Sequence, residues 1–213
     1  MACCNESHCG SKAVADGRYR IVLWTVLLIN ATMFAVEIGA GLAAGSAALQ
    51  ADALDFFADA ANYAISLFVL GMALKWRALA ALIKGASMGL FGLWVIGTVI
   101  WHGVQGTIPG WGTMSVVGAL ALSANLACLG LLYAWRNGDS NMRSVWICSR
   151  NDVLANFAVL AAALGVFGTQ TGWPDLVVAA IMASLALHGS WVIIRHALSD
   201  WRSTVPPASV AAE

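Results

Sequence analysis

The chain has 213 residues, of which 60% are hydrophobic and only 10% are charged, and its mean hydropathy is +0.78. Soluble domains contain roughly a quarter charged residues, so this composition excludes an ordinary soluble protein and indicates an integral membrane protein. Eleven Lys and Arg residues balance eleven Asp and Glu residues. Without a net positive charge, the chain is not expected to bind nucleic acid.

Six apolar segments are each long enough to cross a hydrocarbon core, which takes about 20 residues. They are residues 19–43, 47–74, 78–102, 112–135, 145–168 and 174–198. We therefore predict an all-α integral membrane protein, a six-transmembrane-helix bundle. Its domains are expected to be a flexible Cys-rich segment at 1–18, the transmembrane domain at 19–200 and a short tail at 201–213, without a soluble C-terminal domain.

The basic residues predict the orientation of the bundle, because Lys and Arg near helix ends are retained on the cytoplasmic side. In the six-helix arrangement all eleven fall on one side: Lys12, Arg18, Arg20, Lys75, Arg77, Lys84, Arg136, Arg143, Arg150, Arg195 and Arg202. The loops on the opposite side contain neither residue. We expect both termini to be cytoplasmic and the chain to reside in a bacterial cytoplasmic (inner) membrane.

The second segment carries three carboxylates, Asp52, Asp55 and Asp59, within about two helical turns. At 100° per residue they share a face about 60° wide. Asp52 is equally well explained as a helix N-cap, but Asp59 lies too deep for that. Intramembrane Asp residues are costly, normally face the bundle interior and mark ion paths. Since no Lys or Arg is expected at the same depth, the substrate is predicted to supply the neutralising positive charge.

The fifth segment offers partners for these carboxylates, because Cys148, Asp152 and Asn156 follow one another at intervals of four residues and share a stripe. Two helices that each present two donor groups can build a four-coordinate site. Tetrahedral oxygen and sulfur donors suit Zn²⁺ and Cd²⁺ and disfavour Mg²⁺. The predicted metal ligands are Asp55, Asp59, Cys148 and Asp152.

Two of these four residues also fit roles that involve no metal. Cys148 could be a small buried hydrophobe, and Asp152 could be a surface partner of Arg150. The depths also differ: at a rise of 1.5 Å per residue, Asp55 lies about 9 Å outside the middle of its predicted helix and Asp152 about 7 Å inside the middle of its own. A meeting of the two groups requires tilted helices, or a fifth helix that begins inside the bundle.

Two stretches resemble the cation diffusion facilitator family of divalent metal transporters. NATMFAVEIGAGLAAGSAALQADALDFFADAANYAISL, residues 30–67, is similar to its first two helices, with Gly45-Ser46 and Asp55/Asp59 in the matching places. SRNDVLANFAVLAAAL is similar to the fifth helix, where Cys148 replaces the usual His of an HxxxD pair.

The resemblance implies a proton-coupled efflux transporter and no enzymatic activity. The expected substrates are Zn²⁺ or Cd²⁺, with Co²⁺ and Fe²⁺ as further candidates, and the expected partners are protons, the lipid bilayer and a second copy in a homodimer. No bound cofactor is expected. Protons and metal would compete for the same donor atoms, which is the physical basis of antiport.

The N-terminal segment supports a different hypothesis, because Cys3, Cys4, His8 and Cys9 offer soft donors in the cytoplasm. They would suit a metal-binding membrane sensor or accessory protein, although an incidental Cys-rich terminus accounts for them equally well. An intramembrane hydrolase is not favoured, since the chain contains no HExxH motif.

Two further features concern the first and third segments. Glu37 lies deep in the first segment and is expected to serve packing or proton handling rather than metal ligation. Gly85xxxGly89 in the third segment is expected to let another helix approach closely.

Overall fold

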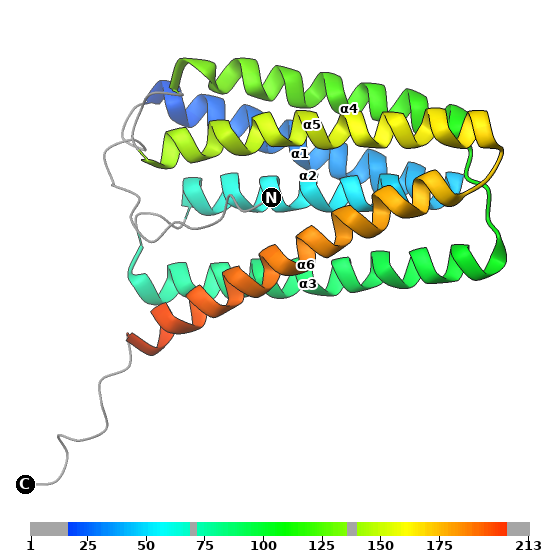
Figure 1. Cartoon of the computed structure of the whole chain (residues 1–213). Coiled ribbons are helices and arrows are strands. Elements are labelled where there is room, and N and C mark those ends of the chain that lie inside the picture. The colour runs from blue at the N-terminus through cyan, green and yellow to red at the C-terminus, as the bar shows by residue number, and fades with distance from the viewer. Residues whose placement is uncertain (1–16, 69–71, 136–139, 204–213) are drawn as a thin grey trace, which may run out of the picture.

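The computed structural model describes residues 17–68, 72–135 and 140–203, and the side chains of these residues except those of 135–148. Within these ranges the chain forms six α-helices and a short 3₁₀ turn (Figure 1). They are α1 (Gly17–Ala44), α2 (Ala47–Phe68), α3 (Leu74–Gln105), α4 (Trp111–Leu132), η2 (Tyr133–Trp135), α5 (Ser140–Thr169) and α6 (Trp173–Ser203).

The prediction of an all-α, six-helix membrane bundle is confirmed, with changed boundaries. α2 ends at Phe68 rather than at residue 74, and α5 begins at Ser140 rather than at residue 145. Five helices are long and apolar enough to cross a membrane: α1, α3, α4, α6 and the Ser149–Thr169 part of α5. α2 is not among them because three Asp residues lower its hydropathy, although its 22 residues would span about 33 Å.

α2 lies in the middle of the bundle, which explains how its carboxylates are kept from lipid. α1, α4 and α5 form one group, α3 and α6 pack together as a second, and α2 contacts α1, α3, α5 and α6 (Figure 1). Residues 47–54 of α2 are all buried. The outer helices instead expose large apolar side chains, as expected of lipid-facing surfaces: Ile21, Leu28, Leu90, Ile100, Val116 and Leu164.

α3 and α6 approach closely because glycines line their contact. A Cβ atom on Gly85 would lie 2.8 Å from Cγ1 of Ile194, and one on Gly89 would lie 2.8 Å from Oγ of Ser190. The Ser190 hydroxyl donates a hydrogen bond of 2.7 Å to the carbonyl of Gly85. The expectation that Gly85xxxGly89 permits close helix packing is therefore confirmed.

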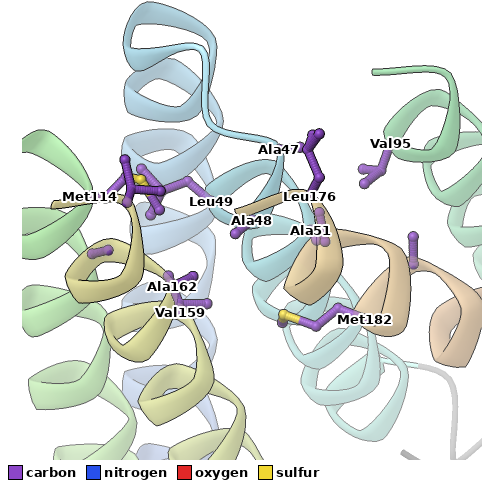
Figure 2. Close-up of a cluster of buried hydrophobic side chains, with 14 residues drawn as sticks. Ala47, Ala48, Leu49, Ala51, Val95, Met114, Val159, Ala162, Leu176 and Met182 are labelled. Carbon is purple, nitrogen blue, oxygen red and sulfur yellow. The ribbon is translucent and has the colours of Figure 1, made fainter. Parts of the chain in front are cut away.

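The α1–α2, α3–α4 and α5–α6 connections meet at the end of the bundle opposite the described termini (Figure 1). The amide of Gly110 donates to the carbonyl of Ala44 at 2.9 Å, which ties two of the connections together. Beneath them, the first turns of α2 pack against α3, α4, α5 and α6 in a cluster of buried apolar side chains, the apolar layer (Figure 2). Its members include Ala47, Ala48, Leu49, Ala51, Val95, Met114, Val159, Ala162, Leu176 and Met182.

Candidate metal centre

Asp59 on α2 and Asp152 on α5 meet inside the bundle. Their carboxyl groups lie close enough to interact. The observed helix bounds explain how: Asp59 lies 1.5 residues past the middle of Ala47–Phe68, and Asp152 lies 2.5 residues before the middle of Ser140–Thr169. Because the helices are antiparallel, these offsets of about 2 and 4 Å point to the same side of the bundle. The difference in depth expected from the sequence was between Asp55 and Asp152: Asp55 lies 2.5 residues before the middle of α2, on the opposite side of the bundle middle from Asp152, so that difference stays an expectation.

Tyr63 holds the Asp59 carboxylate from one turn further along α2. Its hydroxyl donates to Oδ2 of Asp59 at 3.2 Å and lies 3.3 Å from Oγ of Ser149 on α5. Tyr63 and Ser149 are buried, and Asp59 is only 9% exposed. The tyrosine thus links the two helices beside the carboxyl pair. Sequence reasoning missed both residues, although Tyr63 follows Asp59 at the helical spacing of four.

The other two predicted ligands are less closely defined. Asp55 is half-buried on α2. Cys148 belongs to α5, but its side chain lies outside the described residues. Among the side chains that the structure describes, no three His, Cys, Asp or Glu groups are arranged to hold a metal ion. The four-residue site therefore stays a prediction, of which the Asp59–Asp152 contact is the described part. Cys3, Cys4, His8 and Cys9 also lie outside the described residues.

Asp52 belongs to a second group of polar side chains between α2 and α5, the second level. On α5 this group contains Asn156, one helical turn after Asp152. Asn156 donates its amide to both oxygens of Asp52 at 2.9 Å, and Asn125 on α4 donates to Oδ1 of Asn156 at 3.3 Å. Asp52 is fully buried five residues after α2 begins. Its interpretation as a helix N-cap is therefore wrong, because the helix starts nearly two turns earlier than that interpretation requires.

Glu37 on α1 joins this second level. Its carboxyl is fully buried and interacts with that of Asp52. Both carboxyl oxygens of Glu37 are buried and have no hydrogen-bond partner among the described residues. The arrangement fits the packing or proton-handling role expected for Glu37.

The N-terminus of α2 is capped by a carboxylate from another helix. Asp175 at the start of α6 accepts hydrogen bonds from the Ser46 hydroxyl at 2.6 Å, from the Ala47 amide at 2.8 Å and from the Ala48 amide at 3.1 Å. The Ser46 hydroxyl also accepts from the Leu49 amide at 3.1 Å. Asp175 is only 1% exposed. Its negative charge is favourable at a helix N-terminus, so α6 fixes the position of the helix that carries the carboxylates.

Lys84 corrects the expectation that no cation lies at the depth of the Asp residues. It is only 6% exposed, and its ammonium donates to the side-chain carbonyl of Asn62 on α2. The same ammonium acts electrostatically on Asp59. The expectation was wrong because α3 begins at Leu74, four residues before its predicted start, which places Lys84 ten residues inside the helix.

Comparison with known proteins agrees with this architecture. Residues 23–200 match the model of the cation efflux transmembrane domain. The chain is 24% identical over 205 residues to the zinc transporter ZitB of Pectobacterium atrosepticum, covering 86% of this chain and 62% of the relative. It is also 24% identical over 193 residues to the human proton-coupled zinc antiporter SLC30A8, covering 75% of this chain and 50% of the relative.

A third relative is the cadmium, cobalt and zinc/H(+)-K(+) antiporter of Bacillus subtilis, which is 24% identical over 198 residues, covering 84% of this chain and 62% of the relative. The chain thus spans between 50% and 62% of the length of these relatives. The domain match covers all six helices but the first turns of α1 and the end of α6. On this basis the chain belongs to the cation efflux family, the cation diffusion facilitators, which are transporters and not enzymes.

Proposed function

We propose that this chain is a proton-coupled efflux transporter of Zn²⁺ and Cd²⁺. The proposed ligands are Asp55, Asp59, Cys148 and Asp152. The observation that carries the proposal is the contact between the Asp59 and Asp152 carboxyl groups, which brings two oxygen donors from different helices together in a cation efflux domain. The substrates in the names of the three relatives, zinc in all and cadmium in one, support the choice of metal.

Proton coupling follows from the chemistry of the Asp59–Asp152 pair. A divalent cation binds carboxylates in their ionised form, so protons and metal compete for the same oxygens and metal binding releases protons. Protonation from the opposite side would in turn release the metal. Two of the relatives are named as proton-coupled or H(+) antiporters, which supports this exchange.

The proposed direction rests on the distribution of charge. The described Lys and Arg residues at helix ends gather at the end of the bundle where α1 begins and α6 ends, whereas the turns at 45–46, 106–110 and 170–172 contain neither residue. The preference of Lys and Arg for the cytoplasmic side supports cytoplasmic termini and a bacterial inner-membrane location. A proton gradient directed inward would then drive metal out of the cytoplasm.

The test is metal flux in sealed proteoliposomes, read with a metal-sensitive dye and a pH dye together. The wild type should exchange Zn²⁺ or Cd²⁺ for protons, whereas Asp59→Ala and Asp152→Ala should lose transport, because each removes one oxygen-donor group of the pair. Asp200→Ala is the matched control, since Asp200 lies near the end of α6, and it should transport normally. A sensor would show no flux with any variant, and normal transport by both site variants would overturn the site.

A further inference from the structure

Lys84 is a buried cation inside a membrane bundle, ten residues after α3 begins. Such groups are rare and costly inside membranes, and they normally pair with other charged groups or line ion paths. Its ammonium donates to the side-chain carbonyl of Asn62, an uncharged amide on α2. Asn62 follows Asp59 by three residues and therefore lies on the neighbouring turn of α2.

The anchoring of Lys84 to α2 directs its charge to the candidate metal centre. The ammonium acts electrostatically on Asp59, whose other neighbours are the Tyr63 hydroxyl and the Asp152 carboxyl. The α2–α3 contact thus places a fixed positive charge beside a predominantly anionic set of side chains. A fixed positive charge next to carboxylates stabilises their ionised form and repels any further cation that arrives.

We propose that Lys84 is a built-in counter-cation of the metal centre, which lowers the affinity for the divalent cation and thereby promotes its release. The proposal rests on the proposed role of Asp59 as a metal ligand. Its physical basis is the charge of the donor set: three carboxylates and a thiolate would hold a divalent cation with a surplus of two negative charges, and Lys84 offsets one of them. Transport requires binding that is strong enough for entry but weak enough for release.

A purely structural role is the competing hypothesis, in which Lys84 only ties α3 to Asn62 of α2. Lys84→Gln separates the two roles, because it retains a hydrogen-bond donor and removes the charge. Lys84→Arg retains the charge. Lys75→Gln is the matched control on the same helix, since Lys75 is exposed and lies 5.3 Å from the ring centre of Trp201.

The experiment measures equilibrium binding of Cd²⁺ to the purified full chain in detergent, followed by flux in proteoliposomes. Lys84→Gln should bind Cd²⁺ about tenfold more tightly, which corresponds to about 1.4 kcal/mol, and should transport it with a lower maximal rate. Lys84→Arg and Lys75→Gln should keep the wild-type affinity. Thermal unfolding checks each variant, and Lys84→Met, which keeps most of the aliphatic stem, repeats the measurement if the Gln variant does not fold.

The outcomes separate this inference from the proposed function. Unchanged or weaker Cd²⁺ binding by folded Lys84→Gln or Lys84→Met, together with loss of binding in Asp59→Ala, would overturn the counter-cation and leave the metal site standing. Normal binding by Asp59→Ala would instead overturn the site itself. Equal losses in Lys84→Gln and Lys84→Arg would assign Lys84 to the structural tie.

Discussion

Replacement of Asp175 by Ala should destabilise the bundle by about 2 to 4 kcal/mol. The carboxylate accepts three hydrogen bonds, from the Ser46 hydroxyl and the Ala47 and Ala48 amides, and it is almost fully buried. Hydrogen bonds between membrane helices average about 0.6 kcal/mol each in double-mutant cycles, so three give about 2 kcal/mol. The upper value includes the cost of leaving amides of a helix N-terminus unsatisfied, which is about 0.5–2 kcal/mol when a cap is lost. Asp175→Asn retains one acceptor oxygen and should lose about half as much.

The assay is thermal unfolding of the purified chain in detergent. A loss of 2 to 4 kcal/mol corresponds to a melting temperature roughly 5–15 °C lower for a chain of this size. Asp200→Ala on the same helix is the control and should change the melting temperature little. A double-mutant cycle of Asp175→Ala with Ser46→Ala should show a coupling of about 1 kcal/mol. If Asp175→Ala unfolds at the same temperature as Asp200→Ala, the cap contributes nothing and the reasoning fails.

Two further predictions concern helix packing and selectivity. Gly85→Val should destabilise the α3–α6 contact by about 1–3 kcal/mol through overpacking, since a Cβ atom on Gly85 would lie 2.8 Å from Ile194. Gly97→Val is the control and should be nearly neutral, because a Cβ atom on Gly97 meets nothing within 4 Å. Equal melting temperatures of the two variants would contradict this prediction. Cys148→His should keep transport and raise the ratio of Zn²⁺ to Cd²⁺ flux at matched free metal and pH, because imidazole is a harder ligand than thiolate; an unchanged ratio would remove Cys148 from the proposed site.

Local sequence patterns were sufficient to predict the six helices and the helix faces that carry the candidate site. Apolar length gave six helices because each backbone segment in lipid must satisfy its own hydrogen bonds. Helical spacing placed Asp52, Asp55 and Asp59 on one face of α2 and put Asp152 and Asn156 on one stripe of α5. Four of these residues lie where the two helices meet: Asp52, Asp59, Asp152 and Asn156.

These patterns could not predict contacts between residues that are far apart in the sequence. Asp175 looks like a first-turn acidic residue of its own helix, and only the folded bundle shows that it caps α2. Lys84 was placed near a helix end because hydropathy does not fix where a helix begins, and a predicted start four residues too late hid its depth. The pairing of Asp52 with Asn156 depends on the register between α2 and α5, which no single helix specifies.

The cap on α2 has a consequence for the biosynthesis of the protein. Among the six described helices, α2 is the one whose hydropathy is too low to mark it as a membrane span. Asp175, which caps it, lies 129 positions after Ser46 in the chain. At about 5–20 residues per second, a ribosome needs roughly 6–26 s to bridge that interval. Throughout that time the nascent chain holds a carboxylate-bearing helix whose first amides lack their final acceptor. Completion of α2 therefore has to wait for the synthesis of α6, and a chain stalled before Asp175 is expected to expose α2 to quality-control proteases.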